Sequence, residues 1–236
     1  MDARIKSGHD KGVCLPMKFF SFWRSQASFR VRIAMNLKQI PAEVVYVDLD
    51  ADAHHADAFR RINPQMALPA LVEDGGTVLF QSLAIIEYLE EIHPTPALLP
   101  ADPRGRARVR GLALIVACEG HPPLVPRIRR YLDRELNLRD SQQEAWRRHW
   151  TVETLAALEG HLAGHTDTGR FCHGDTPTLA DICLVGHATV AAMLKIDLSP
   201  WPTVKRIYET AMAMPEFATA HPLAQPDTPE AMRKKG

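Results

Sequence analysis

The chain has 236 residues, of which 46% are apolar and 24% are charged, a composition typical of a folded globular protein with one large or two small domains. Its 28 basic and 28 acidic residues leave no net charge, which argues against nucleic acid and against an anionic membrane as partners. Four cysteines without zinc spacing exclude a disulfide scaffold and indicate a reducing, cytoplasmic compartment. The longest apolar stretch, residues 179–194, contains Asp181 and His187 and is too short to span a bilayer.

The first half of the chain alternates between strand and helix patterns. β-Branched and aromatic runs predict strands, and apolar residues at i, i+4 and i+7 predict helices. Asp74-Gly75-Gly76 separates two of the strands and predicts a hairpin turn. The order β-α-β followed by β-β-α indicates an α/β domain, with a small mixed sheet covered by helices. The expected strands are 18–22, 43–49, 70–73 and 77–80, and the expected helices are 27–38 and 82–92.

A proline-rich break near residue 100 separates this half from the rest of the chain. No strand pattern follows the break, so the second half is predicted to be all α. The first 16 residues have no period and no apolar signal core, and we interpret them as a flexible extension. The predicted divisions are 1–16, 17–99 and 104–236, and the expected helices of the last division are 104–119, 123–136, 142–164, 178–194 and 202–213.

Two predicted helices begin with hydroxyl residues that are able to bind an anion. Ser25 and Ser28 lie where the first strand leads into the first helix, and Gln81-Ser82 closes a strand and opens another helix. Free N–H groups and the helix dipole favour negative charge at both positions. The alternative is that Ser25, Ser28 or Ser82 only caps its helix, and the sequence alone leaves both interpretations open.

Leu68-Pro69 immediately precedes a predicted strand. Proline has no N–H to donate at the start of that strand. If the bond is cis, the backbone of Leu68 turns outward and is free to pair with a peptide-like ligand. The alternative is an ordinary trans proline at a strand edge, which position alone favours because cis bonds are a small minority.

These three positions, in this order and spacing, resemble cytosolic glutathione transferases. The resemblance is to the zeta class, which includes maleylacetoacetate and maleylpyruvate isomerases, and it extends from about Met17 to Glu230. It implies a thioredoxin-like N-terminal domain, an all-helical C-terminal domain, a homodimer and glutathione as cofactor. The stretches that carry it are FWRSQASFRVRIAMNLK, NPQMALPAL, QSLAIIEYLEEIHPTPALLPAD, GDTPTLADICLV, IDLSPWPT and AQPDTPE.

The resemblance also implies which residues bind the cofactor. Ser25 matches the serine that hydrogen-bonds the glutathione sulfur. The backbone of Leu68, before a cis Pro69, is expected to pair with the cysteinyl part. Gln81 and Ser82 are expected to hold the γ-glutamyl end, and His54 is expected near the glycyl end.

The residues expected to face the substrate are Arg24, Arg127 and His121. The two arginines resemble those that bind substrate carboxylates, and His121 occupies a position at the edge of the site. Two positions depart from the family pattern. Ala27 stands where zeta enzymes usually have cysteine, and Met193 aligns with an arginine that many members carry near the substrate.

The activity implied is cis–trans isomerisation of maleyl-type diketo acids in aromatic catabolism, by reversible addition of the glutathione thiolate. A general conjugating transferase or weak peroxidase is the alternative enzyme, and a non-catalytic binding protein is the alternative of another class. No metal site is expected, because His161 and His165 lack the acidic context of a zinc helix. We interpret Trp146 and Trp150, four residues apart, as packing residues.

Overall fold

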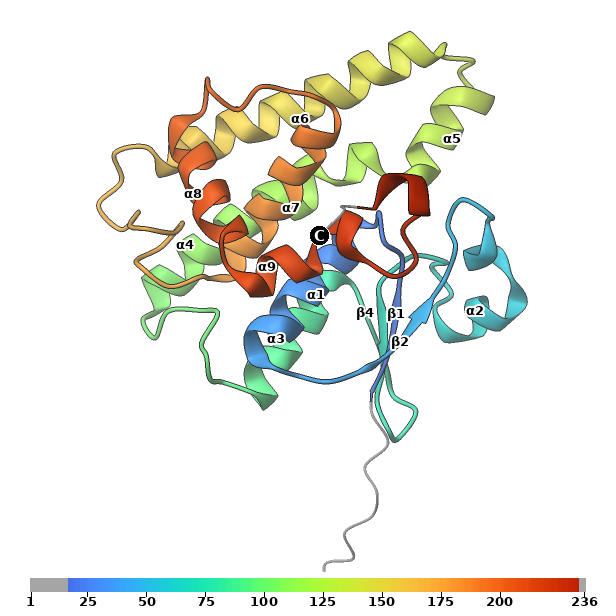
Figure 1. The fold of residues 1–236 in the computed structure, drawn as a ribbon, viewed down its shortest axis with the longest axis horizontal. Coiled ribbons are helices and arrows are strands. Elements are labelled where there is room, and N and C mark those ends of the chain that lie inside the picture. The colour runs from blue at the N-terminus through green and yellow to red at the C-terminus, as the bar shows by residue number, and fades with distance from the viewer. Residues whose placement is uncertain (1–16, 234–236) are drawn as a thin grey trace, which may run out of the picture.

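The computed structural model of the chain describes residues 17–233 (Figure 1). The extension predicted over residues 1–16 lies outside the described residues, and the exact domain boundaries stay a prediction. In the part of the chain that is described, no helix is both long and apolar enough to cross a membrane.

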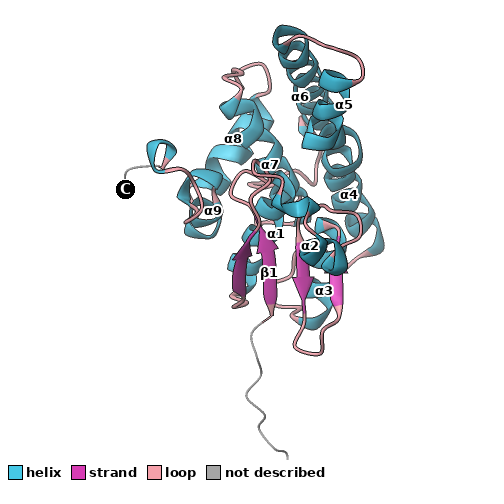
Figure 2. Ribbon diagram, turned by 90° about the vertical axis from the view of Figure 1, so that its right-hand side faces the viewer, coloured by secondary structure: helices cyan, strands magenta, loops and turns pink. Residues whose placement is uncertain are grey.

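The N-terminal half contains a four-stranded mixed sheet in the order β2-β1-β3-β4 (Figure 2). β1 is parallel to β2 and antiparallel to β3, which forms the expected hairpin with β4. Gly76, with a φ of +82°, supplies the turn conformation that a side chain disfavours. The strands are β1 (Lys18–Ser21), β2 (Glu43–Tyr46), β3 (Ala70–Val72) and β4 (Val78–Phe80).

The two faces of the sheet are covered by different helices (Figure 1). Phe19 packs into the main core with α1 (Gln26–Lys38) and α3 (Ser82–Ile92), both of which were predicted. Because side chains alternate along a strand, Phe20 faces the opposite side and contacts Phe59 of α2 (Asp57–Ile62). The sequence analysis missed α2, because a six-residue helix with one buried side chain has no detectable period.

Among its described residues the second half contains helices and no strand, as predicted. Its central helix, α7, is buried along most of its length and contacts α1, α4, α6 and α8. Asp181 accepts hydrogen bonds from the backbone N–H and the hydroxyl of Thr178, both at 2.8 Å, which fixes the start of α7. The helices are α4 (Pro103–Leu114), α5 (Pro126–Arg134), α6 (Asp140–Leu162), α7 (Leu179–Met193), α8 (Pro202–Met212) and α9 (Pro215–Ala220).

One predicted helix differs at its C-terminal end in a way that matters for the site. The helix expected to reach residue 119 ends at Leu114 and continues as a π-helical segment, Ile115–Gly120. A Cβ on Gly120 would lie 2.4 Å from the Thr154 hydroxyl oxygen, so only glycine allows this close approach to α6. The segment ends by presenting His121 to the space between the two halves.

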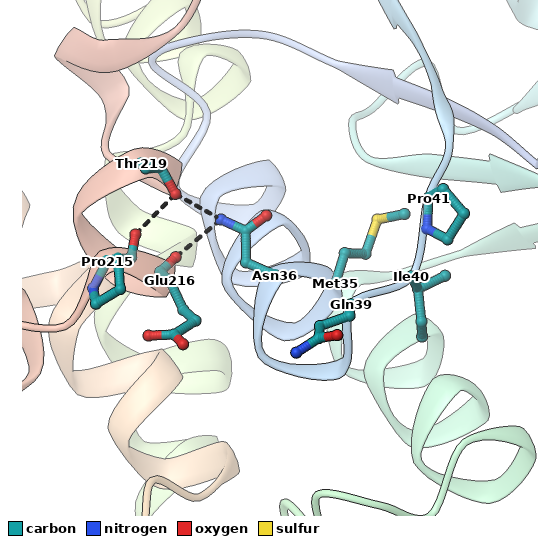
Figure 3. Close-up of a pocket in the computed structure, with 8 residues that line it drawn as sticks. All are labelled: Met35, Asn36, Gln39, Ile40, Pro41, Pro215, Glu216 and Thr219. Carbon is teal, nitrogen blue, oxygen red and sulfur yellow. Dashed lines mark hydrogen bonds between the residues drawn. The ribbon is translucent and has the colours of Figure 1, made fainter.

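The two halves are joined through α1, which packs on α7 and α9. Figure 3 shows the outer part of this contact, a shallow pocket of about 380 Å³ between the end of α1 and α9. There the Asn36 amide donates to the carbonyl of Glu216 at 2.8 Å and to the Thr219 hydroxyl at 3.1 Å. These bonds hold the C-terminal segment against the sheet domain.

Arg32 fixes the loop that leads into α1. Its buried guanidinium donates to the Ala220 carbonyl at 2.9 Å, the Ser21 hydroxyl at 3.1 Å and the Trp23 carbonyl at 3.0 Å. Burial lowers the pKa of Arg32 to about 10, which still leaves it charged near neutral pH. The end of β1, the loop and α9 are therefore tied together by one side chain.

Candidate functional site

A cavity of about 590 Å³ lies between the sheet domain and the helical domain. All nine site residues predicted from the sequence line this cavity, although their roles remain predictions. They are Arg24, Ser25, His54, Leu68, Pro69, Gln81, Ser82, His121 and Arg127.

Ser25 is compatible with both roles that the sequence left open, helix cap and anion donor. It is the N-cap of α1, and its hydroxyl oxygen accepts a hydrogen bond from the Ser28 N–H at 3.1 Å. It is also half-buried and lines the cavity. Capping uses one lone pair of the oxygen, so the O–H proton remains available to donate to an anion. Ser28, in contrast, is fully buried and does not line the cavity.

The bond between Leu68 and Pro69 is cis, as the family resemblance implied and position alone did not favour. Neither the N–H nor the carbonyl of Leu68 has a hydrogen-bond partner among the described residues. The Asn63 amide donates to the neighbouring Ala67 carbonyl at 2.7 Å and stabilises this loop. Leu68 therefore offers a free donor and a free acceptor at the cavity wall.

Gln81, and not Ser82, is the N-cap of α3. Gln81 has a φ of 68°, unusual for a residue other than glycine, and its side chain donates to the Gln65 amide oxygen at 2.9 Å. Ser82 is the first helical residue, so the interpretation of its hydroxyl as a helix cap was wrong. No side chain caps the first turn of α3, which leaves its N–H groups open to the cavity side.

His54 lies in a short turn before α2 and is buried against the cavity. The Arg130 Nη2 atom lies 3.0 Å from its Nε2 atom. Because a guanidinium only donates, Nε2 must accept and the ring proton must sit on Nδ1. Burial, followed by the charges of His55 and Arg130, lowers the pKa of His54, which keeps the ring neutral. Its buried Nδ1 has no partner among the described residues.

Asp52, His54 and His55 bring three potential metal-ligand atoms within 4.8 Å of one another. The guanidinium of Arg130 lies among them, 2.9 Å from an Asp52 oxygen and 2.9 Å from the His55 Nε2 atom. A cation is already present at the centre of this group. The arrangement is therefore an ion-pair cluster that joins the turn before α2 to α5.

His121 is held from behind by a buried arginine of α1. The Arg30 Nη2 atom lies 3.0 Å from the His121 Nδ1 atom, so Nδ1 accepts and the ring proton is on Nε2. Burial, and then the charge of Arg30, keeps the pKa of His121 well below its usual value. His121 is thus a neutral, oriented donor.

Two buried side chains of α1 carry polar atoms with no partner among the described residues. They are the amide nitrogen and oxygen of Gln26 and the Nε and Nη1 atoms of Arg30. Both residues line the cavity, and both pack beside Gly186 of α7, where an added Cβ would lie 3.4 Å from the Gln26 side chain. A buried guanidinium without a carboxylate is costly unless an anion or a polar group faces it.

The cavity is strongly electropositive although the chain has no net charge. Six arginines line it, and no aspartate or glutamate is among its lining residues in the described part of the chain. Two of the six are paired with acids just outside the lining: Arg24 with Asp50 and Arg130 with Asp52. The six are Arg24, Arg30, Arg127, Arg129, Arg130 and Arg147.

Sequence reasoning missed four of these arginines: Arg30, Arg129, Arg130 and Arg147. Arg129 and Arg130 belong to a basic run that also has the pattern of a solvated helix face. Arg30 lies on the apolar side of a helix that packs on α7, and Arg147 lies in an amphipathic stretch of α6. No local signal separates these side chains from ordinary surface or core arginines, because their convergence depends on how the two domains pack.

Comparison with known protein families identifies the chain over most of its length. The glutathione S-transferase N-terminal domain matches residues 24–92, and the glutathione S-transferase C-terminal domain matches residues 123–215. The chain belongs to the glutathione S-transferase family. The predicted fold class, a thioredoxin-like domain followed by an all-helical domain, is thereby confirmed.

Individual relatives of this glutathione S-transferase cover nearly the whole chain. A maleylpyruvate isomerase of a Ralstonia species is 45% identical over 90% of this chain and 100% of its own length. The solved structure of a maleyl pyruvate isomerase, a bacterial zeta-class transferase, is 44% identical, with a TM-score of 0.87 over 90% of this chain and all of that chain. A maleylacetoacetate isomerase from Methylobacterium extorquens, solved with malonate and glutathione, is 46% identical, with a TM-score of 0.88 over 90% and 99% of the two chains. The resemblance to the zeta class is confirmed.

The apolar part of this transferase's cavity contains the two positions that depart from the family pattern. Ala27 and Met193 both line the cavity, together with Leu114, Ala117 and Val190. Trp146 and Trp150 pack edge to face, and the Trp146 N–H donates to the Pro123 carbonyl at 2.9 Å, which supports the loop before α5.

Proposed function

We propose that the protein is a glutathione-dependent cis–trans isomerase of maleyl-type diketo acids such as maleylacetoacetate or maleylpyruvate. One observation carries the proposal: a cavity lined by six arginines, with no acidic lining residue among residues 17–233, lies directly at the N-terminus of α1, beside Ser25. A thiolate and a dicarboxylate are both anions, and both need such an environment. The names of the relatives support the same reaction.

The sheet-domain side of the cavity fits glutathione. Leu68 has a free backbone donor and acceptor for the cysteinyl part, and Gln81 and Ser82 stand at an uncapped helix N-terminus that suits the γ-glutamyl carboxylate. The unpartnered Nδ1–H of His54 suits the glycyl carboxylate. Together with Ser25 and Pro69, these groups match the donors and acceptors of a tripeptide.

Glutathione, when bound, supplies a thiolate that adds reversibly to the cis double bond, so that rotation about the resulting single bond precedes its departure. The protein must therefore favour the thiolate over the thiol near neutral pH. A free thiol has a pKa near 8.5. The Ser25 O–H and the N-terminus of α1 lower that value together, because both interactions favour the charged sulfur.

Arg24, Arg127 and His121 act on the substrate in this proposal. Arg24 directly precedes Ser25 in the chain and lines the cavity. It stabilises the negative charge that develops on the substrate carbonyl oxygen. Arg127 lies close enough to His121 for its charge to help lower the pKa of the histidine. Arg127 and the oriented Nε2–H of His121 therefore suit the carboxylate that is conjugated to the double bond.

We also propose that the protein is a cytoplasmic homodimer that acts in the breakdown of aromatic compounds. The resemblance to zeta-class transferases supports the dimer and the catabolic role, and the four cysteines without disulfide-scaffold spacing support the reducing compartment. Light scattering of the purified full chain tests the dimer: a mass of about twice 26.4 kDa is expected, and the monomer mass would contradict it.

The experiment that tests the reaction is isomerisation of maleylacetone with and without glutathione. We expect turnover only when glutathione is present, with no net consumption of the thiol, because the addition is reversed in each cycle. Stoichiometric loss of glutathione, or no turnover at all, would contradict an isomerase.

A general conjugating transferase is the second candidate, and the apolar wall that includes Met193 favours it. A methionine in place of a charged residue makes room for uncharged electrophiles. Conjugation of chlorodinitrobenzene measures this activity. We expect it to be slower than isomerisation of maleylacetone, because six arginines favour an anionic substrate.

A further inference from the structure

The wall formed by α5 and α6 carries two arginines that the proposed function does not use. Arg129 of α5 and Arg147 of α6 both line the cavity, and both are partly buried. Neither has a hydrogen-bond or ion-pair partner among residues 17–233, and the Nε atom of Arg129 is buried without one. Two unpaired cations thus face the same space from two helices.

Three arginines near this wall are paired with acids, whereas Arg127, like Arg129 and Arg147, has no ion-pair partner among residues 17–233. Arg24 pairs with Asp50, Arg130 pairs with Asp52, and Arg148 pairs with Glu144. Arg148 also donates to the Leu194 carbonyl at 2.6 Å, so it points away from the cavity wall and into the helix packing. Asp50, Asp52 and Glu144 are therefore already engaged.

The environment of Arg129 and Arg147 disfavours their positive charges. Burial, followed by the charges of Arg147 and Arg24, lowers the pKa of Arg129. Burial, followed by the charge of Arg24, lowers the pKa of Arg147. Partly buried like charges that lie this close destabilise one another, and an anion held between them relieves the repulsion.

We propose that Arg129 and Arg147 together bind the terminal carboxylate of the substrate's diketo arm. This inference rests on the proposed isomerase function and adds a second carboxylate site to it. The site makes the protein selective for dicarboxylates. Arg129 and Arg147 thereby take the role of the arginine that many zeta-class members carry at the position of Met193. Carboxylates prefer the planar, two-pronged donor set of a guanidinium, and two such groups from different helices surround one carboxylate.

The two carboxylates of the substrate place different demands on the protein. The carboxylate next to the double bond must be held at a fixed position relative to the sulfur, and His121, supported from behind by the buried Arg30, is a rigid donor. The terminal carboxylate lies at the end of an arm with several rotatable bonds. Long arginine side chains on two helices can follow it, which is why we assign it to Arg129 and Arg147.

Maleylacetoacetate and maleylacetone form a matched pair of substrates, because they differ only in the terminal carboxylate. We expect Arg129→Gln and Arg147→Gln each to raise the KM for maleylacetoacetate by about tenfold, the usual effect of losing one charged hydrogen-bond partner. The KM for maleylacetone should change by less than about twofold. Arg134→Gln, which removes an equal charge from an exposed position of the same α5, is the control and should change neither value.

A binding measurement separates this inference from the proposed reaction. Calorimetry with the saturated analogues succinylacetoacetate and succinylacetone detects the terminal carboxylate without turnover, and the two variants should weaken only the first. Equal weakening of both compounds, or of neither, would overturn the assignment. If the wild-type protein isomerises neither substrate, the proposed function fails, and the calorimetric difference alone still decides whether the two arginines bind this carboxylate.

Discussion

The two walls of the cavity offer different kinds of groups to an anion. The sheet-domain wall uses backbone groups, helix N-termini and short side chains, as at Ser25, Leu68 and Ser82. The helical-domain wall uses long arginine side chains from α5 and α6. The first kind of site is produced by the fold itself, whereas the second depends on which residues occupy the helix positions that face the cavity.

This difference predicts that the two walls respond differently to substitution. Backbone donors at a cis-proline loop or a helix start cannot be changed by substitution without changing the fold. Arginine side chains on a helix can be replaced without changing the backbone, and here Met193 at one position coexists with Arg129 and Arg147 at others. We therefore expect substitutions on the first wall to weaken catalysis or glutathione binding and substitutions on the second wall to change substrate selectivity.

The largest effect is expected from Ser25→Ala on the sheet-domain wall. Loss of the hydroxyl donor should lower kcat for maleylacetone by about 100-fold, the usual effect of removing one donor to a reactive anion. It should also raise the pKa of the bound glutathione thiol, which is measured by titrating the ultraviolet absorbance of the thiolate.

The Ser25 variant also loses a helix cap, at a cost of about 1 kcal/mol in the free energy of unfolding. Ser25→Thr keeps both the cap and the donor, and we expect it to retain most of the activity. Full activity in Ser25→Ala, with a properly folded protein, would remove Ser25 from the mechanism.

The stability of the helical-domain wall should depend on pH through His187, which is buried beneath Gly120. Its Nε2–H donates to the Thr151 carbonyl at 3.2 Å, and burial lowers its pKa from 6.5 to about 4. The unfolded chain takes up this proton near pH 6.5, whereas the folded chain resists it until about pH 4. The contribution of neutral His187 to the free energy of unfolding is therefore fully present above pH 6.5. It is lost as the pH falls from 6.5 to about 4, by up to roughly 3 kcal/mol.

Urea unfolding at about pH 7.5 and about pH 5 measures this loss. His187→Gln cannot take up the proton, so the variant should lose less stability than the wild type between the two values. An equal loss in both proteins would assign the acid sensitivity to other groups.

A smaller effect is expected at the junction of the two walls, where Arg24 is paired with Asp50. Arg24→Gln should lower kcat for maleylacetone by about tenfold, because one charge that stabilises the developing oxyanion is removed. Asp50→Asn leaves Arg24 in place and free of its partner, so it should preserve kcat or increase it. A larger loss in Asp50→Asn than in Arg24→Gln would mean that the ion pair positions the loop and that Arg24 does not act on substrate.

The smallest effect is expected at His54, which contributes one hydrogen bond to the glycyl end of glutathione in the proposed function. His54→Ala should raise the KM for glutathione by about threefold to tenfold and leave kcat nearly unchanged. His161→Ala, on an exposed helix face, is the control. A fall in kcat without a change in KM would place His54 in the chemical step instead.

The sequence predicted the sheet, the two helices on one of its faces and the helical second half, because each depends on a local period. It also predicted nine residues that the structure brings to one cavity. It did not predict α2, α9 or the π-helical end of α4, which are short and have weak periods. The interpretation of Ser82 as an N-cap failed because the positive φ of Gln81 moves the cap by one residue.

The amino-acid sequence by itself determined the position of the N-terminus of α1, that of α3 to within one residue, and that of the proline loop, since these features depend on neighbouring residues in the chain. Only the tertiary structure decided that Arg24 and the arginines of α1, α5 and α6 converge, and that Asp50 and Asp52 pair with Arg24 and Arg130. The reason is physical. Charge–charge contacts between residues far apart in sequence depend on the packing of the two domains, and no periodicity of the chain encodes that arrangement.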